Sequence, residues 1–145
     1  MATDRPIRVF VDSDVIISSL ISRSGAAFTL ISHTEQVKLY ISNYSVSELN
    51  KVVDRLHLQQ EELHNIIKTR LTAVKIDQTY KKVQLQFADY VRDSDDAHVV
   101  AGAKEARVSF LVSYNVRHFN TEKLRQDLQI ILLTPGLFLQ YLRSL

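Results

Sequence analysis

The stretch IRVFVDSDVIISSLI, residues 7–21, decides the fold prediction. Its first five residues are apolar except for Arg8 and are rich in β-branched side chains, which is typical of a short strand buried on both faces of a parallel sheet. Asp12, Ser13 and Asp14 end this strand, and the apolar run 15–21 that follows indicates a helix. The order of strand, acids and helix therefore predicts the first unit of an α/β fold.

The rest of the chain repeats this alternation. We predict further strands at 38–42, 74–76, 109–112 and 130–133, and helices at 26–32, 45–56, 59–71, 79–91, 94–107 and from Pro135 onward. Ser45 and Glu48 have the spacing of a capping box, Ser94 is placed to cap its helix, and Thr134 before Pro135 is a helix start. With no repeat and no linker in the sequence, we expect residues 1–145 to form one α/β domain with a parallel sheet of about five strands, covered by helices on both faces.

Composition excludes several classes of protein. The chain has no cysteine, so disulfides and thiolate metal sites are excluded, which agrees with a reducing cytoplasm. The N-terminal residues 1–8 lack the layout of a secretory signal, and no apolar run approaches the roughly 20 residues of a membrane span. We therefore expect a cytoplasmic protein without a membrane association.

The acidic residues are bunched, whereas the 18 Lys and Arg residues are spread along a chain of net charge +2. Polar side chains from four segments follow a predicted strand or begin a predicted helix: Asp12 and Asp14, Glu48, the group Asp93, Asp95 and Asp96, and Asn115. Right-handed crossovers place the carboxyl ends of all parallel strands at one edge of the sheet, where α/β proteins bind ligands. We therefore expect these side chains to meet.

Carboxylates that meet repel one another, and a hard divalent cation that prefers oxygen ligands relieves the repulsion. Such a cation, Mg²⁺ or Mn²⁺, can activate water and stabilise the leaving oxygen of a phosphodiester. The candidate metal ligands are Asp12 and Asp96, then Glu48, and then Asp14 and Asp93. Each acid taken alone has an alternative interpretation, as a helix cap or as a charge that complements a helix dipole.

Four segments resemble the motifs of a known family, the PIN domains. These segments are VFVDSDVIIS (9–18), SNYSVSEL (42–49), RDSDDAHVVAGAKEA (92–106) and FLVSYNVRHF (110–119). They occur in the family's order and cover nearly the whole chain. The resemblance implies a compact three-layer α/β/α sandwich and an Mg²⁺- or Mn²⁺-dependent endoribonuclease, as in the VapC-like toxins of toxin–antitoxin pairs. It also implies an RNA substrate, an antitoxin protein as partner, and a homodimer.

The resemblance also assigns residues. Asp12, Glu48 and Asp96 match the family's core acids, and Asp14 matches a position that is often Asn. Asn115 matches the fourth acidic position, where it keeps a carbonyl oxygen but lacks the charge. We expect Asn115 to act through water, and Asp93 or Asp95 is a candidate source of the missing charge.

Residues that flank these acids are candidates for substrate binding. They are Ser13 between the two first acids, Lys51 one turn after Glu48, and Tyr114, Arg117 and His118 around Asn115. The basic side chains would contact RNA phosphates, and Tyr44 or Tyr114 would stack on an unpaired base. A solvated loop, a turn hydroxyl and a tyrosine at the rim of the core are the competing interpretations. For His98 the sequence favours a buried or stacking side chain over a metal ligand.

Two other functions remain open at this point. One is a PIN-like domain that is catalytically weak or inactive and acts mainly by binding protein, which the Asn at position 115 favours. The other is a phosphoacceptor domain of the receiver type, which needs a Lys where this chain has Ser113, Tyr114 and Asn115.

Overall fold

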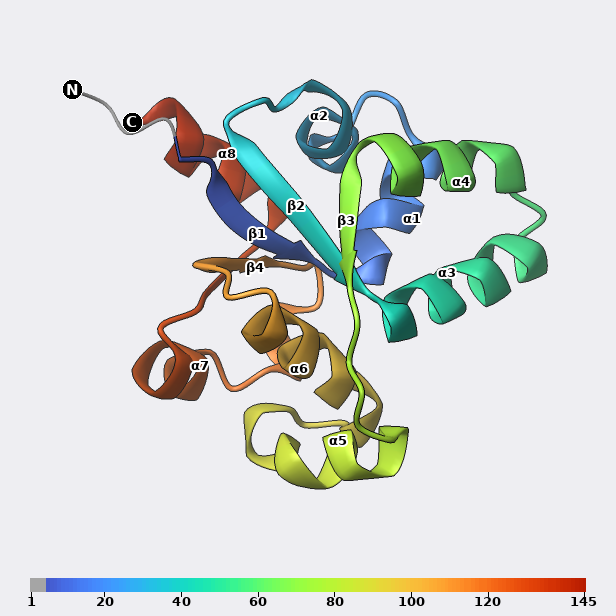
Figure 1. Cartoon of the computed structure of the whole chain (residues 1–145). Coiled ribbons are helices and arrows are strands. Elements are labelled where there is room, and N and C mark those ends of the chain that lie inside the picture. Colours follow the sequence, from blue (N-terminus) through green and yellow to red (C-terminus); the bar gives the residue numbers. More distant parts are fainter. Residues whose placement is uncertain (1–4) are drawn as a thin grey trace.

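The centre of the molecule is a sheet of five parallel strands in the order β3-β2-β1-β4-β5, seen in a computed structural model that describes residues 5–145 (Figure 1). The strands are β1 (Ile7–Val11), β2 (Val37–Ser42), β3 (Leu71–Val74), β4 (Phe110–Val112) and β5 (Ile131–Leu133). The first four residues of the polar N-terminal segment lie outside the described part. Among residues 5–145 no single helix is long and apolar enough to cross a membrane. Only the helices Ser13–Ile21 and Ala26–His33, which are bent by 97° at their junction, would pass that test as a pair.

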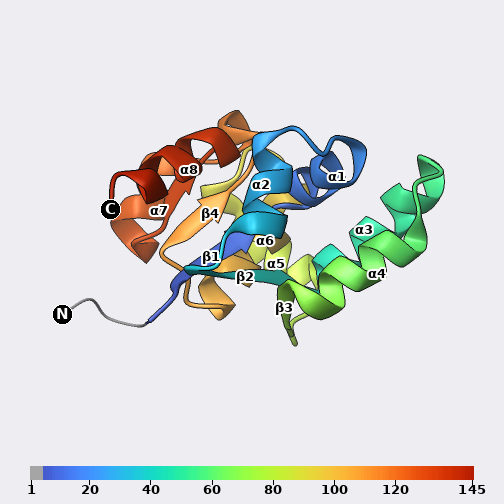
Figure 2. The same ribbon diagram turned by 90° about the horizontal axis from the view of Figure 1, so that it is seen from above.

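Helices cover both faces of this sheet, as Figure 2 shows from above. One layer consists of α1 (Ser13–Ile21), α2 (Ala26–His33), α3 (Asn43–Arg55), α4 (Gln60–Thr69) and α8 (Pro135–Arg143). The other layer consists of α5 (Tyr80–Gln86), α6 (Ala97–Glu105) and α7 (Thr121–Leu128). The predicted three-layer α/β/α sandwich around a parallel sheet is confirmed.

The alternation of side chains along the strands builds two cores. Val9 and Val11 face the layer that contains α1, whereas Phe10 between them faces α6. All three side chains are fully buried. This is why these three successive positions of β1 are all apolar, as in a strand that is covered on both faces.

Several predicted boundaries were wrong. The strand predicted at 74–76 lies at Leu71–Val74, so the helix predicted to reach 71 stops at Thr69. The helix predicted at 79–91 stops at Gln86, because the next segment pairs with a distant one through an isolated bridge between Val91 and Phe119. Helix α7 was not predicted.

Two predicted helix caps were also wrong. The N-cap of α3 is Ser42, which forms a capping box with Ser45, so Glu48 is not a capping acid and its side chain is free for another role. Asp93, not Ser94, caps the 3-10 turn Ser94–Asp96 that precedes α6, because its side chain accepts the backbone N–H of Asp95. Thr134 caps α8 as predicted.

Candidate active site

A pocket of about 320 Å³ lies at the carboxyl ends of the central strands. Its lining residues are Asp12, Ser13, Asp14, Ile17, Glu48, Val52, Asp96 and Asn115. The chain runs outward from β1 to β2 and β3 and then returns to add β4 and β5 on the other side of β1. This reversal next to β1 is the position at which open α/β sheets bind ligands.

Asp12 is held in the floor of this pocket, where it is 8% exposed. One carboxylate oxygen, Oδ1, accepts the backbone N–H of Ser13 at 2.8 Å, and Oδ2 accepts the hydroxyl of Ser113 at 2.8 Å. Asp12 is thus the N-cap of α1, which was its alternative interpretation, and it also lines the pocket. Burial, followed by the charge of Asp14, raises the pKa of Asp12 to about 7.

Asp14 reaches the same pocket from the first turn of α1. Its Oδ2 accepts the backbone N–H of Tyr114 at 3.1 Å, which ties α1 to the segment after β4. Its Oδ1 is buried and has no hydrogen-bond partner within residues 5–145. Burial raises the pKa of Asp14 above the usual value, against the opposing effect of the Tyr114 N–H.

Glu48 enters from α3 and lies opposite a buried imidazole. Nε2 of His98 is 3.6 Å from Oε2 of Glu48, and this neighbour is the main reason why the pKa of Glu48 is lowered. His98 is 3% exposed and lies beside the rings of Tyr44 and Tyr80, so the buried, stacking role predicted for it is confirmed. Glu48 is therefore the acid of this pocket that stays ionised most readily.

Asp96 enters from the end of the 3-10 turn before α6. Burial raises the pKa of Asp96, and the charge of His118 opposes this rise. Nδ1 of His118 lies 3.2 Å from Oδ2 of Asp96. His118, predicted to contact phosphate, therefore contacts a carboxylate in this structure.

The structure gathers six of the predicted site residues in this pocket, Asp12, Ser13, Asp14, Glu48, Asp96 and Asn115, and leaves the others outside. Asn115 is exposed, lines the pocket and donates its backbone N–H to the hydroxyl of Ser113. The predicted residues outside the pocket lining are Tyr44, Lys51, Asp93, Asp95, Tyr114, Arg117 and His118. Asp93 acts as a cap instead, whereas the alternative interpretation for this acid was a charge that complements the helix dipole.

Two residues important to the geometry were not predicted as site residues. Ser113 is fully buried and links Asp12 to Asn115 through one hydroxyl. His98 sets the environment of Glu48. A hydroxyl directly after a buried strand was a signal for Ser113, whereas nothing local in the sequence pairs His98 with Glu48.

The donor set fits a divalent cation of the magnesium type. Within residues 5–145 no three His, Asp or Glu side chains form a ready metal cage. Magnesium does not require one, because it keeps several waters and binds through one or two carboxylates together with substrate phosphate. Three carboxyl groups with raised pKa values and an unpartnered buried oxygen on Asp14 mark a pocket with an excess of negative charge.

Solved structures with the same fold include a toxin–antitoxin complex and two protein complexes bound to DNA fragments. A toxin–antitoxin complex from Klebsiella pneumoniae is similar at 18% identity and a TM-score of 0.59, over 88% of this chain and 97% of that chain. VapBC2 from Rickettsia felis, bound to a promoter DNA fragment, is similar at 12% identity and a TM-score of 0.58, over 88% and 98%. FitAB bound to the IR36 DNA fragment is similar at 15% identity and a TM-score of 0.54, over 88% and 94%. At these identities the likeness shows the fold alone.

Sequence comparison identifies the family. A search of curated proteins gives no match. The PIN domain family matches residues 8–117, well over half of the 145-residue chain, and the match spans β1 to the segment after β4, which contains every polar residue of the pocket. This chain belongs to the PIN domain family.

Proposed function

We propose that residues 1–145 form one PIN-like nuclease domain, an endoribonuclease that hydrolyses RNA phosphodiester bonds with Mg²⁺ or Mn²⁺. The observation that carries the proposal is that carboxylates from three separate segments, Asp12 and Asp14, Glu48, and Asp96, line one pocket at the strand ends. Asp12, Glu48 and Asp96 would hold the cation, with Asp14 beside them. When bound, the cation activates water and offsets charge on the phosphoryl group.

The surrounding side chains would position these acids and the water. Ser113 and the Ser13 N–H fix both oxygens of Asp12, so that the carboxylate faces the pocket in one orientation. His98 keeps Glu48 ionised, which suits its carboxylate to hold the cation. Asn115 at the rim offers an amide that can orient water by hydrogen bonding.

We further propose that the protein is the toxin of a toxin–antitoxin pair. The support is that the similar structures from Klebsiella pneumoniae and Rickettsia felis are toxin–antitoxin and VapBC complexes, and that the family match covers the same fold. An antitoxin protein and a second copy of the chain are the proposed partners. The proposed location is the cytoplasm, where RNA and such an antitoxin would meet the chain.

A second candidate function is a catalytically weak or inactive domain that acts mainly by binding protein. Asn115 favours it, since this residue brings no charge to a position at the pocket rim where the family pattern has an acid. Asp93 does not compensate, because it lies outside the pocket lining and caps a turn.

An assay of single-stranded RNA cleavage distinguishes the nuclease function from the protein-binding function. We expect the wild type to cleave RNA with Mg²⁺ or Mn²⁺ and to lose this activity in EDTA. Asp12→Asn should lower the cleavage rate by at least about 100-fold, because the loss of electrostatic stabilisation in an active site has an effect of that size. Asp89→Asn is the matched control, since Asp89 has a side chain that is 82% exposed and lies outside the pocket. Equal and negligible rates for the wild type and Asp12→Asn with both metals would favour the binding function.

A further inference from the structure

A second hollow, of about 510 Å³, adjoins the candidate active site. The two hollows share Glu48 and Val52 in their linings. The other residues that line the second hollow are Tyr44, Ser47, Lys51, Arg55 and Tyr80. We call the part that these five residues line the α3 groove. Because two residues belong to both hollows, a bound chain can pass from one to the other without leaving the surface.

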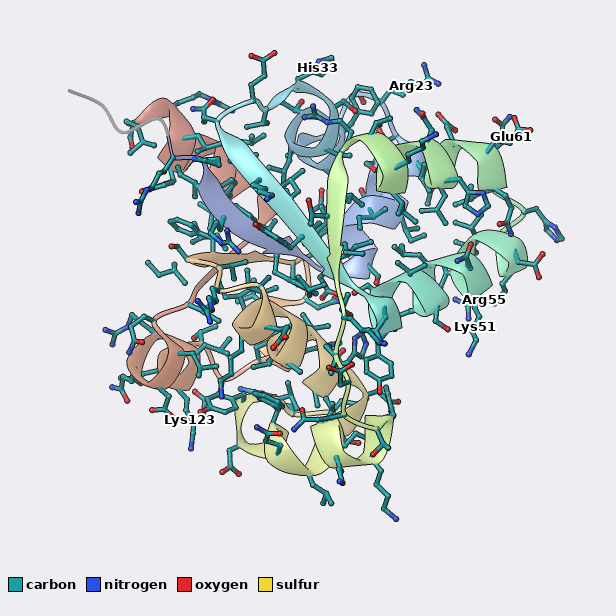
Figure 3. The ribbon with its side chains drawn as sticks, in the orientation of Figure 1. Arg23, His33, Lys51, Arg55, Glu61 and Lys123 are labelled. Carbon is teal, nitrogen blue, oxygen red and sulfur yellow. The ribbon has the colours of Figure 1, made fainter. Side chains whose placement is uncertain are left out.

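The α3 groove follows one face of α3. Tyr44, Glu48, Lys51 and Arg55 recur at the three- and four-residue spacing that places side chains on the same side of a helix. Lys51 and Arg55 are exposed, and both lie along the outer part of α3 (Figure 3). Neither forms an ion pair within the part of the chain that the structure describes. The groove thus carries positive charge next to an acidic pocket.

Two tyrosine rings form an aromatic wall at the inner end of the groove. Tyr44 and Tyr80 meet edge to face, with ring centroids 5.5 Å apart at an interplanar angle of 65°. The hydroxyl of Tyr44 donates to the carbonyl of Gln78, and that of Tyr80 donates to the carbonyl of Asp95 at 3.2 Å. Both rings are therefore held in place, and Tyr80 remains 37% exposed. Fixed, accessible tyrosine faces are surfaces on which unpaired bases stack.

We propose that the α3 groove binds an unpaired stretch of the RNA strand that flanks the scissile phosphate, an inference that rests on the proposed nuclease function for the identity of the ligand. Lys51 and Arg55 contact phosphates, and a base packs against Tyr80 and Tyr44. The charges suit this arrangement, because the phosphate to be cleaved needs a cation at the acids, whereas the neighbouring phosphates find basic side chains directly. A duplex cannot use the aromatic wall, since its bases are stacked on one another.

Binding of a fluorescent single-stranded RNA oligonucleotide tests the charged part. The protein is Asp12→Asn with Mg²⁺, so that bound RNA is not cleaved. We expect Lys51→Ala/Arg55→Ala to weaken binding about tenfold at low salt and to reduce the slope of log affinity against log salt by about 1.4, the value for two lost phosphate contacts on a single strand. The matched control is Lys123→Ala/Arg125→Ala, which removes the same charge from α7, far from α3 in Figure 3.

The aromatic part is tested by Tyr80→Leu and Tyr80→Phe in the same background. Leu removes the ring, and we expect it to weaken binding about 5- to 100-fold, as loss of one base–aromatic stack does. Phe keeps the ring and loses only the hydroxyl, so binding by Tyr80→Phe should stay within about threefold of its parent. Thermal unfolding of each variant identifies any that fails to fold. The double-stranded form of the same RNA should show no dependence on Tyr80.

Failure of this inference differs from failure of the nuclease proposal. If Lys51→Ala/Arg55→Ala and Lys123→Ala/Arg125→Ala lost equal RNA affinity, RNA binding in the α3 groove would be contradicted. Equal binding by Tyr80→Leu and Tyr80→Phe would contradict it as well, even if the wild type cleaves RNA. If RNA binding depended on Lys51, Arg55 and Tyr80 but the wild type cleaved no RNA, RNA binding in the α3 groove would be supported and the proposed nuclease function would be contradicted.

Discussion

At the scale of single residues, burial of the Asp12 carboxyl group costs folding free energy whenever that group is ionised. Its pKa is about 7 in the folded chain, against a usual value of 3.8. The folded state therefore binds more protons than the unfolded state between these values. Stability from this group falls as the pH rises from about 4 towards 7 and stays at its lowest above 7.

We expect Asp12→Asn to stabilise the metal-free protein at pH 8. The amide keeps an oxygen for the Ser13 N–H and removes the buried charge, which the pKa shift values at about 4 kcal/mol. The amide nitrogen cannot accept the Ser113 hydroxyl, which offsets part of this gain. The net gain should be about 2 kcal/mol, or roughly 4–8 °C in melting temperature. At pH 5 the gain should be much smaller, because the wild-type carboxyl is then largely neutral. Thermal unfolding in EDTA at both pH values measures this, with Asp89→Asn as the exposed control. If Asp12→Asn were less stable than the wild type at pH 8, burial of the ionised Asp12 carboxylate would not cost folding free energy as we state.

Single residues also show how far the sequence could predict the site. Asp12, Glu48 and Asp96 were predicted to meet because each follows a strand or begins a helix in a parallel fold, and the structure places all three in one pocket. The hydrogen bond between Ser113 and Asp12 joins residues 101 positions apart, so no local pattern reveals it. The pKa shifts likewise depend on burial, which only the folded chain defines.

At the scale of helices and strands, segments with long apolar patterns were predicted correctly. Segments whose backbone pairs with distant residues were not. β1 and α1 were predicted from periodicity, and only the start of α1, at Ser13, differs from the predicted run 15–21. The helix predicted after Gln86 was wrong because the backbone of this segment pairs with residues 118–120. The N–H of Arg92 donates to the carbonyl of His118, and the N–H of Asn120 donates to the carbonyl of Tyr90. These tertiary hydrogen bonds override the helical spacing of the side chains.

Packing of α6 against the sheet depends on Gly102. A Cβ atom at this position would lie 2.5 Å from Cε2 of Phe10, whose ring is fully buried and cannot move away freely. We expect Gly102→Ala to lower the free energy of unfolding by about 1–3 kcal/mol, the cost of overpacking a core. Urea denaturation measures it.

Gly136 in α8 provides the control for that substitution, because a Cβ there meets nothing within 4 Å. Gly136→Ala should leave stability unchanged or raise it by up to about 1 kcal/mol through the lower entropy of the unfolded chain. If both alanine variants behaved alike, α6 would not pack against β1 as closely as the structure has it.

At the scale of the whole molecule, the strand order positions the acids. The chain leaves β1 on one side and returns to β4 on the other, so Asp12 after β1 and Ser113 after β4 become neighbours across the reversal. Glu48 and Asp96 then enter from α3 and from the turn before α6, one in each helical layer. The fold itself thus builds a pocket that is rich in carboxylates and poor in positive charge.

A crystal soaked in Mn²⁺ and measured at the manganese absorption edge tests this account most directly. We expect an anomalous peak inside the pocket, bonded to Asp12 and to Glu48 or Asp96, and no such peak in Asp12→Asn. A pocket without manganese at saturating concentration, or a peak that persists unchanged in Asp12→Asn, would contradict the claim that these carboxylates are gathered to hold a divalent cation.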